Sequence, residues 1–324
     1  MNCPLCSSPD TLDLFRLDQR VADEDFQIKR CNKCYISWSH PIPDKEQLSA
    51  YYPDEYHGKG GQERFNPVME FFVGTSRRKR ASIVSDFNSN KKGKILDIGC
   101  GRGVMLSILK KKGWHVYGTE FSRHSSSFAR ERYAIEVATK DVADCQFPAR
   151  TFDVVTMWHV LEHLPYPLST IKEVGRILKS GGRLIIEVPN FGGLQARLFT
   201  NKWFHLDSPR HIFHFNEDTL VNYIEKSGFK VIKAQNLSWE YDPFGFIQSF
   251  LNTFSFHFDS FYNFLRSGRG KMLDGKKWTY LMDILFAVVL FPLLFPLSLL
   301  ASLLSSFLRR GGIIRLFCIK REKE

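Results

Sequence analysis

The chain has 324 residues, 44% of them hydrophobic, which is a globular rather than a disordered composition and gives ample length for a core. Its formal charge of +11 is compatible with nucleic acid, an anionic membrane surface or no specific partner, although the basic runs at 77–80 and 110–112 lie on predicted helices, where a solvated face is the commoner explanation. The first ten residues lack a basic start and an apolar stretch, so we expect no secretory signal and a cytoplasmic origin, and the seven cysteines do not resemble a disulfide framework.

Two C-x-x-C pairs lie near the start of the chain and are separated by strand-like stretches at 12–17 and 25–29. They consist of Cys3, Cys6, Cys31 and Cys34. Two such turns bring four thiolates to the corners of a tetrahedron, the geometry of a closed structural zinc site. We therefore predict a zinc ribbon over residues 1–40 that needs its metal to fold. A redox dithiol is the alternative, but redox pairs occur singly beside a βαβ unit.

Residues 41–93 are predicted to be a connector followed by a helix at 68–87. The connector is rich in proline, tyrosine and glycine. Its tyrosines, Tyr51, Tyr52 and Tyr56, either line a substrate entrance or pack the ribbon onto the main domain.

Residues 95–103, ILDIGCGRG, predict a buried parallel strand that runs into a glycine loop and then a helix. Such a loop lets a ligand lie against bare backbone N–H groups, although an ordinary tight turn gives the same pattern. A second strand at 114–120 ends in Glu120, at the spacing where a carboxylate reaches the hydroxyls of a ribose. No lysine followed by Ser or Thr closes the loop, which disfavours a triphosphate site.

From about residue 94 to residue 233 the sequence resembles the class I S-adenosylmethionine-dependent methyltransferases, of the type 11/23-like subgroup with an N-terminal zinc ribbon. The resemblance is carried by the glycine loop, the acid after the second strand, FDVVTMWHVLEHL at 152–164 and IKEVGRILKSGGRLIIEVPN at 171–190. It implies an α/β fold with a doubly wound, seven-stranded Rossmann-like sheet and S-adenosylmethionine as cofactor. The family pattern assigns the cofactor to Asp97, Gly99, Cys100, Gly101, Gly103, Glu120, Phe121, Asp141, Val142 and Trp158. In this subgroup, of which some members act on sugars or cell-surface intermediates, glycine often stands where this chain has Tyr35.

The predicted fourth strand ends at Trp158 and His159, and His163 lies on the turn that follows. Residues that end strands face the ligand in such sheets, and histidine suits general-base chemistry because its ordinary pKa is about 6.5. We therefore predict His159 and His163 as catalytic residues, with His159 as base or substrate positioner. The alternative is a histidine that only packs the turn, since many relatives catalyse mainly by holding acceptor and sulfonium in line.

A Pro-Arg-His-x-x-His-Phe sequence lies at 209–215. In the resembling subgroup this sequence precedes the helix that leads to the sixth strand, which implies an acceptor pocket lined by His205, Arg210, His211 and His214. Three histidines in this segment also allow a metal site. Asn216 as a cap and Gly228 as a stop predict the helix, and 229–235 supplies the sixth strand.

The expected seventh strand, at 311–321, arrives late, so residues 242–310 are an insertion in the last hairpin. Apolar residues from Phe244 to Leu265 at steps of three and four predict one helix that lies in a membrane interface or packs on its own protein. Residues 284–308 contain no charged side chain. A helix of this length would measure about 37 Å, which is long enough for a transmembrane helix because the hydrocarbon core is about 30 Å thick. Because of Pro292 and Pro296, basic residues at both ends and the return of the chain to the sheet, we expect a proline-broken hairpin in one leaflet instead.

These features predict a methyltransferase at the cytoplasmic side of the cell membrane, attached through residues 284–308. The expected acceptor is a small molecule or a lipid-linked compound: a quinone precursor, a polyprenyl-linked sugar or a surface-polysaccharide intermediate. A non-catalytic membrane adaptor and an RNA methyltransferase are the alternatives, and the absence of an Asn-Pro-Pro-Tyr motif after the fourth strand makes nucleic acid unlikely. The predicted divisions are 1–40, 41–93, 94–241, 242–310 and 311–324.

Overall fold

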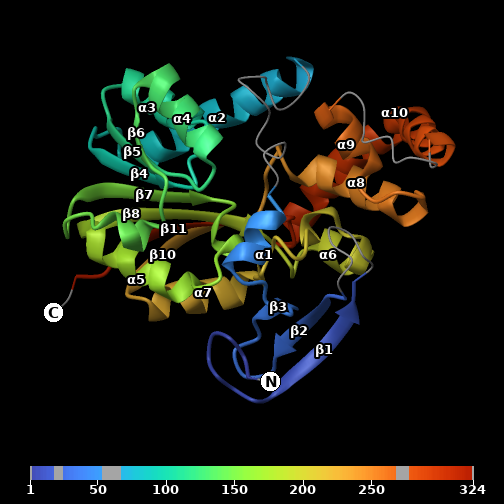
Figure 1. Ribbon diagram of the computed structural model, residues 1–324, viewed down its shortest axis with the longest axis horizontal. Coiled ribbons are helices and arrows are strands. Elements are labelled where there is room, and N and C mark those ends of the chain that lie inside the picture. The colour runs from blue at the N-terminus through green and yellow to red at the C-terminus, as the bar shows by residue number, and fades with distance from the viewer. Residues whose placement is uncertain (1, 18–24, 53–66, 268–276, 323–324) are drawn as a thin grey trace.

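The computed structural model describes residues 2–17, 25–52, 67–267 and 277–322, and in that part of the chain the strands form two sheets (Figure 1). The larger sheet has seven strands in the order β10-β11-β8-β7-β4-β5-β6. They are β4 (Lys94–Ile98), β5 (His115–Thr119), β6 (Glu136–Ala138), β7 (Phe152–Trp158), β8 (Leu178–Pro189), β10 (Phe229–Gln235) and β11 (Ile313–Lys320). β4 to β8 are parallel, and β11 runs antiparallel between β8 and β10. This confirms the predicted doubly wound fold, whose strand order reverses between β4 and β7, where such sheets bind ligands.

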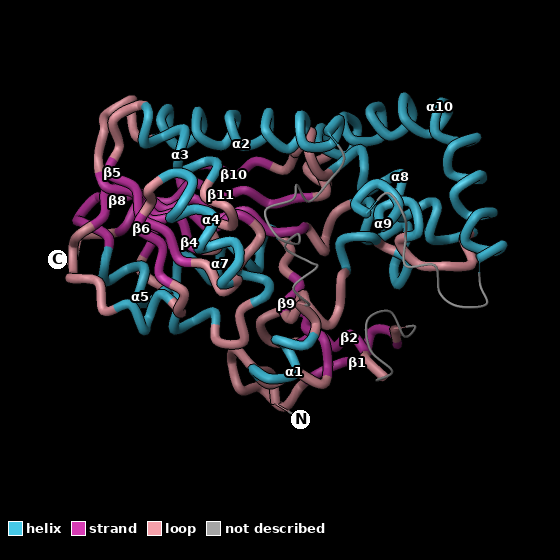
Figure 2. The backbone as a smooth tube through the Cα atoms, turned by 45° about the horizontal axis from the view of Figure 1, so that its top comes forward, coloured by secondary structure: helices cyan, strands magenta, loops and turns pink. Residues whose placement is uncertain are grey.

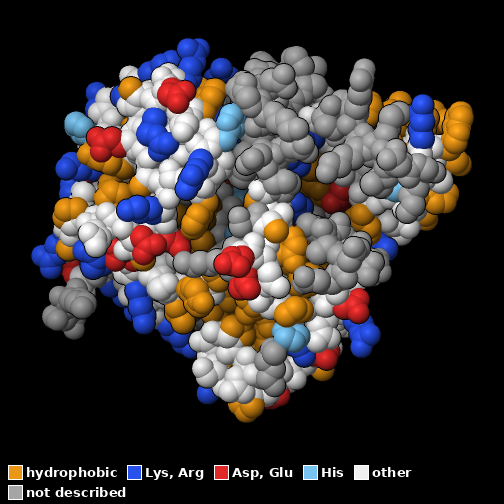
Figure 3. Space-filling view, in the orientation of Figure 1, with side chains coloured by type: hydrophobic (Ala, Val, Ile, Leu, Met, Phe, Trp, Pro, Cys, Tyr) orange, Lys and Arg blue, Asp and Glu red, His pale blue; other side chains and the backbone are white. Residues whose placement is uncertain are grey.

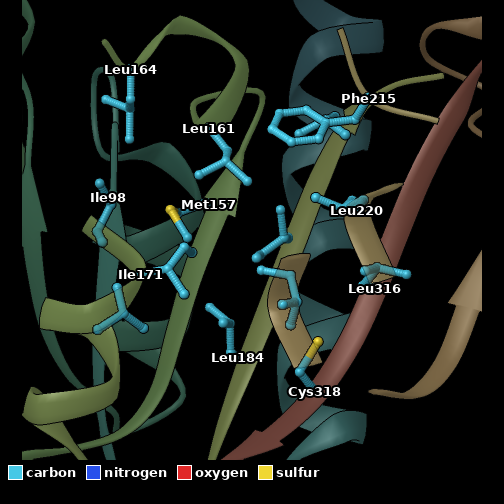
Figure 4. Close-up of a cluster of buried hydrophobic side chains, with 14 of the residues drawn as sticks. Ile98, Met157, Leu161, Leu164, Ile171, Leu184, Phe215, Leu220, Leu316 and Cys318 are labelled. Carbon is cyan, nitrogen blue, oxygen red and sulfur yellow. The ribbon is translucent and has the colours of Figure 1, made fainter. Parts of the chain in front are cut away.

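Helices cover both faces of this sheet (Figure 1). One face carries α2 (Pro67–Phe87), α3 (Val104–Lys111) and α4 (Arg123–Tyr133), and the other carries α5 (Pro167–Ile177) and α7 (Glu217–Lys226). Successive strand residues point to opposite faces, so Ile95 packs with the first group of helices and Leu96 with the second. Figure 4 shows the second cluster, in which Met157, Leu184 and Leu316 of three neighbouring strands meet α5 and α7.

The predicted start of α7 is confirmed in its atomic details. Asn216 Oδ1 accepts from the backbone N–H of Thr219, whose Oγ1 accepts in return from the N–H of Asn216. This reciprocal capping box satisfies two donors that a helix start leaves open. Gly228 then adopts a positive φ of 92° just past the helix end.

The smaller sheet has the order β1-β2-β3-β9 and joins the predicted ribbon to the segment before α7. β1 (Thr11–Arg16), β2 (Gln27–Cys31) and β3 (Ser37–His40) lie in the predicted ribbon, and β9 (Phe213–His214) comes from the segment before α7. β3 pairs antiparallel with β9, with Ser37 opposite His214. The ribbon is therefore part of a sheet that the segment before α7 completes, although the division at residue 40 itself stays a prediction.

The connector contributes one short helix, α1 (Lys45–Ala50), and two described tyrosines. Tyr51 is buried against Phe26 of the ribbon, with ring centroids 6.4 Å apart, as in the packing alternative. Tyr52 instead places its hydroxyl 2.7 Å from His163 Nδ1. Tyr56 lies outside the described residues.

The basic run of α2 is not a solvated face throughout. Arg80 is buried, and both Arg77 and Arg80 form ion pairs with Glu240, at 3.2 and 3.0 Å. The charges on this helix thus serve partly to hold the segment after β10.

The first half of the insertion forms two helices, α8 (Asp242–Phe254) and α9 (Ser260–Ser267), so the prediction of one continuous helix was wrong. The reason is the side chain of Asn252, which accepts from the backbone N–H of Asp259 and donates to its carboxylate. Gln248 and Asn252 are buried, although the pattern of apolar residues predicted them on the exposed face of the helix. Ile247, Leu251 and Phe261 pack on the last helix of the insertion, as the packing alternative requires.

That last helix, α10 (Lys277–Phe307), is one continuous element of 31 residues, so the predicted break into a hairpin does not occur (Figure 2). Pro292 and Pro296 both lie inside it. It is long and apolar enough to cross a membrane by length and composition. Lys276, one of its expected flanking basic residues, lies outside the described residues.

The buried and exposed faces of α10 are the reverse of those in a soluble helix. Its buried positions are Asp283, Ala287, Ser298, Ser302 and Ser305, whereas most of its Leu, Val and Phe side chains are exposed. Figure 3 shows hydrophobic side chains gathered at the end of the molecule that α10 forms. The remaining short elements, in loops near the carboxyl ends of the strands, are η2 (Val142–Cys145), η3 (Leu161–His163), α6 (Leu194–Phe199), η4 (Thr200–Lys202) and η5 (Phe204–Leu206).

Candidate active site

The loop between β4 and α3 turns through three glycines with positive φ, Gly99 at 71°, Gly101 at 55° and Gly103 at 72°. The N–H groups of Gly99 and Cys100 both donate to the carbonyl of Thr119, at 2.8 and 3.0 Å, which ties this loop to the end of β5. A Cβ on Gly99 would lie 2.4 Å from Val160 and one on Gly103 would lie 2.9 Å from Ala129, whereas a Cβ on Gly101 meets no described heavy atom within 4 Å. The loop is therefore packed behind its first and last glycines and open at Gly101.

Glu120, directly after β5, lies beside Gly101. Its Oε2 accepts from the N–H of Gly101 at 2.9 Å and its Oε1 from the N–H of Ser122 at 2.8 Å. Burial raises the pKa of this carboxyl group, and the N–H groups of Ser122 and Gly101 oppose that effect. The neighbouring Phe121 ring is 65% exposed and free to cover a flat ligand beside the carboxylate.

Asp97 lies at the end of β4, next to β7. Its Oδ1 accepts from Thr156 Oγ1 at 2.6 Å. Burial raises the pKa of Asp97 to about 7, against the opposing effects of Thr156 and Arg80. Its protonation state therefore changes close to neutral pH.

The other residues assigned to the cofactor lie at varied depths. Asp141 and Val142 follow β6 at the start of η2, where the Val142 side chain is buried. Cys100 packs toward Gly118 of β5. Trp158 is buried beneath Arg80, whose Cζ lies 4.9 Å from the indole centroid, and beside Arg315. Its contact with the cofactor stays a prediction.

His159 belongs to a buried charge network. Its Nε2 lies 3.0 Å from Glu187 Oε1 and its Nδ1 lies 3.4 Å from Glu162 Oε1, and Glu187 also pairs with Arg315. Burial alone would lower the pKa of His159, but Tyr241, Glu162 and Glu187 together raise it to about 10. A histidine that stays protonated at neutral pH is better suited to positioning than to accepting a proton.

His163 meets one of the predicted pocket residues across two loops. The rings of His163 and His211 lie 4.5 Å apart at their centroids, and Glu162 completes a cluster whose ligand atoms all lie within 4.8 Å of one another. Glu162 was not assigned from the sequence. The signal available for it was its place beside His163, directly after a strand end.

The structure separates the rest of the predicted acceptor pocket. His205 packs against Tyr241 under α8, and burial lowers its pKa to about 4. His214 lies in the ribbon sheet with its Nε2 3.0 Å from Ser39 Oγ, and burial lowers its pKa to about 3. Arg210 pairs with Asp207 while its backbone carbonyl contacts His163. Only His211 of this set joins His163, because β9 carries His214 away to the ribbon.

The four ribbon cysteines converge as the spacing predicts. Cys3 Sγ lies 3.6 Å from Cys34 Sγ and Cys6 Sγ lies 3.5 Å from Cys31 Sγ. These separations approach the value of about 3.8 Å that follows for ligands on a tetrahedral ion with Zn–S bonds of about 2.3 Å. The N–H groups of Lys33 and Cys34 both point at Cys31 Sγ, as they would toward a thiolate. The donor set fits a structural metal.

Comparison with known proteins identifies the class. Residues 75–234 match the family model of a methyltransferase domain. With the seven-stranded sheet and the glycine loop, this match identifies residues 75–234 as a methyltransferase domain of the class I, S-adenosylmethionine-dependent type.

Curated relatives match a part of this chain. It is 34% identical over 104 residues to the ubiquinone biosynthesis O-methyltransferase of Aliivibrio fischeri (strain MJ11), and 33% identical over 106 residues to that of Nitrosococcus oceani. Each match covers 30% of this chain and only 44% of the relative, so the chain spans less than half the length of these curated relatives.

Solved structures share the fold at low identity. A putative sarcosine dimethylglycine methyltransferase from Galdieria sulphuraria superposes with a TM-score of 0.51 at 15% identity, covering 77% of this chain and 87% of that one. The cyclase SpnF superposes with a TM-score of 0.50 at 16% identity, covering 76% and 82%. A cyclase among these neighbours shows that the fold alone does not fix the reaction.

The residues around the glycine loop fit S-adenosylmethionine. The open direction at Gly101, the two carboxyl groups at the ends of β4 and β5 and the exposed ring of Phe121 surround one edge of the sheet. Carboxylates complement the positive charge of an amino-acid sulfonium, and an aromatic face complements an adenine ring.

Proposed function

We propose that this protein transfers the methyl group of S-adenosylmethionine to an acceptor carried on a lipid, at the cytoplasmic side of the cell membrane. The observation that carries the proposal is that α10 buries polar side chains and exposes large apolar ones. This helix is inserted directly before the last strand of the methyltransferase sheet. The names of the matched O-methyltransferases make a quinone precursor the acceptor we favour. Polyprenyl-linked sugars and surface-polysaccharide intermediates are the other lipid-linked candidates.

The position of α10 favours a helix that lies in the membrane surface rather than one that crosses it. At its start, Asp283 accepts from the backbone N–H groups of Phe256 and His257, both at 2.9 Å. At its end, Ser306 donates to Asn236 at 2.8 Å and β11 follows within a few residues. Since both ends are fixed to the protein, only the outward face remains to enter acyl chains, as in interfacial helices.

A hollow of about 650 Å³ between α2 and the end of α10 is a suitable place for the lipid-linked part. Trp239 and Phe307 give it apolar walls, and Lys79 and Arg309 give it positive charge. It also reaches Arg315, which pairs with Glu187 beside His159. An acceptor with an anionic or polar head and an apolar tail matches this lining.

S-adenosylmethionine supplies an electrophilic methyl group when bound. Asp97 and Glu120, with the N–H groups of the glycine loop, would orient it at the sheet edge. We propose His159 as a positioning residue, because both its nitrogens face carboxylates. His163 is the catalytic candidate that contacts the acceptor side, with Tyr52 at 2.7 Å. The rate enhancement would then come mainly from holding the acceptor atom in line with the methyl–sulfur bond of the donor.

We further propose that Cys3, Cys6, Cys31 and Cys34 hold one structural zinc ion. Because β3 of the ribbon pairs with β9, loss of that ion would disturb the segment that carries His211. The ribbon would thus support the acceptor side of the site without taking part in chemistry.

The test is to incubate membranes containing the full chain with S-adenosylmethionine labelled at the methyl group, and to separate lipid, sugar and RNA fractions. We expect label in the lipid extract, and equal activity on a soluble short-chain analogue would refute the role of the membrane. A double variant, Leu285→Glu with Val289→Glu, should release the protein from vesicles, because both side chains are 65% exposed on α10. Leu198→Glu is the matched control, since Leu198 is 61% exposed on α6.

A non-catalytic adaptor would keep the fold and the membrane face without the cofactor. Calorimetric titration with S-adenosylhomocysteine distinguishes the two: binding supports the enzyme, and its absence supports the adaptor.

A further inference from the structure

The turn after β7 buries a carboxylate that has no hydrogen bond within the described part of the chain. Glu162 is 1% exposed, and neither of its carboxylate oxygens finds a donor there. The nearest opposite charge is His159, whose Nδ1 lies 3.4 Å from Oε1 and whose other nitrogen already binds Glu187. His159 is shared between two carboxylates, so its single charge does not fully balance Glu162, and a buried carboxylate without hydrogen-bond donors favours a further cation beside it.

Two histidines beside Glu162 are held in the orientation that metal ligands adopt. His163 Nδ1 lies 2.9 Å from the carbonyl of Arg210, and His211 Nδ1 lies 2.8 Å from the carbonyl of His205. A carbonyl oxygen only accepts, so we infer that each Nδ1 carries the proton and donates it, and the Tyr52 hydroxyl, 2.7 Å from His163 Nδ1, is then a second acceptor of the same proton. The Nε2 lone pair of each ring in its neutral form is then available to a metal ion. A hydrogen bond from the other ring nitrogen to a carbonyl is the usual support of a metal-binding histidine.

We propose that Glu162, His163 and His211 form a binding site for one divalent transition-metal ion, separate from the ribbon cysteines. One carboxylate oxygen and one nitrogen from each ring lie within 4.8 Å of one another, so small side-chain shifts bring them to bonds of about 2.1 Å. Two imidazoles and one carboxylate suit Zn²⁺, Fe²⁺ or Mn²⁺ and leave coordination positions open.

The backbone around this site is fixed by the core. Ile212 donates its N–H to the carbonyl of Glu162 at 2.8 Å, which joins the two loops that carry the three side chains. Leu161 next to Glu162 packs in the same buried cluster as Phe215, as Figure 4 shows. The ligands are therefore positioned by rigid neighbours rather than by a mobile loop.

An oxygen atom of the acceptor would bind the ion at one of the open coordination positions. This role of the ion rests on the proposed methyl transfer. Tyr52, whose hydroxyl lies 2.7 Å from His163 Nδ1, and Asp207, with Oδ2 3.9 Å from His211 Nε2, surround the cluster. Metal binding itself does not depend on that role.

The experiment uses the full chain with its cysteines loaded with zinc, and titrates it with Mn²⁺ while electron paramagnetic resonance counts the free ion. Because thiolate sites bind Mn²⁺ poorly, a loss of the free-Mn²⁺ signal measures binding at the second site and not at the cysteines. We expect one Mn²⁺ per chain, displaced by Zn²⁺, and at least a tenfold loss of affinity in Glu162→Gln and His211→Asn. His205→Gln is the matched control: it removes a neighbouring histidine but keeps the backbone carbonyl that His211 contacts.

Binding of S-adenosylhomocysteine is measured on every variant to show that the sheet is folded. If the wild-type chain takes up no metal beyond the ribbon zinc, or if both ligand variants bind Mn²⁺ like the wild type, the site does not exist. If metal binds but no lipid is labelled, the site stands and the proposed function fails. If lipid is labelled equally after the second metal is removed, the site stands and its role with the acceptor is refuted.

Discussion

The backbone N–H of Gly101 donates a hydrogen bond of 2.9 Å to Glu120 Oε2, and this contact joins the loop after β4 to the end of β5. The same carboxylate that the family pattern assigns to the ribose therefore also holds the glycine loop in shape. We therefore expect cofactor affinity and loop geometry to be coupled through this side chain.

Glu120→Gln should weaken binding of S-adenosylhomocysteine by more than tenfold and lower the free energy of unfolding by about 1–3 kcal/mol, because one of the two backbone N–H groups loses its acceptor. The amide keeps one acceptor for the loop but loses the charge and one of the two acceptor oxygens, and a hydrogen bond to a charged group contributes about 1.5–3 kcal/mol. Calorimetric titration gives the affinity and thermal unfolding gives the stability. Unchanged affinity would remove Glu120 from the cofactor site.

Two glycines of the loop should respond differently to the same substitution. Gly101→Ala adds a methyl group where no described heavy atom lies within 4 Å, so we expect a stability loss of about 1 kcal/mol from its positive φ, and much weaker cofactor binding. Gly99→Ala places that methyl 2.4 Å from Val160 and should cost roughly 1–3 kcal/mol more. Denaturant unfolding of both variants checks this, and equal stabilities would contradict the packing described.

Affinity for S-adenosylmethionine should rise between pH 6 and pH 8. The folded pKa of Asp97 is raised to about 7 by burial, so the carboxylate that attracts the positively charged ligand forms over this range. Without ligand the sign reverses: the raised pKa means that stability falls as pH rises from about 4 to 7, because only the unfolded chain has lost the proton there. Asp97→Asn should bind weakly at all these pH values, and a wild-type profile in that variant would exclude Asp97 as the titrating group.

Tyr35→Gly should stabilise the protein by about 1 kcal/mol. Tyr35 has a φ of 59° and is 59% exposed, so its ring contributes little packing while its backbone occupies a region that costs side-chain-bearing residues roughly 1–2 kcal/mol. The gain is measured by thermal unfolding of the zinc-loaded chain. Tyr166→Gly, at an exposed tyrosine (70%) before α5 whose φ is −125°, is the control and should give no such gain.

Asp283→Leu should loosen the insertion without unfolding the sheet. It removes the acceptor of two backbone N–H groups and of His257 Nδ1, at 2.9 Å each, and unsatisfied donors cost about 1–3 kcal/mol. Hydrogen exchange should increase in α8 to α10 and stay unchanged in β4 and β7. Equal exchange in the insertion would show that Asp283 does not hold α10.

The sequence by itself determined the glycine loop with Glu120 and the cysteine cluster, because each depends on local periodicity or on short fixed spacing, and the resemblance to the methyltransferase family implied the seven-stranded sheet. The continuous α10 was missed since proline predicts a break locally, whereas in the folded chain Asp283, Ser302 and Ser305 of this helix are buried against the rest of the protein. The division of the insertion between α8 and α9 likewise involves hydrogen bonds of the Asn252 and Asp283 side chains with the intervening segment, which no periodicity reveals.

Only the tertiary structure decided which predicted histidines meet. His211 and His214 are three residues apart, yet pairing of β9 with β3 sends His214 to the ribbon and leaves His211 beside His163 and Glu162. Those two loops lie about 50 residues apart in the chain and are joined by the hydrogen bond from Ile212 to Glu162. Spacing along the chain specifies chemistry only within a turn or a strand, and longer-range proximity follows from how the strands pair.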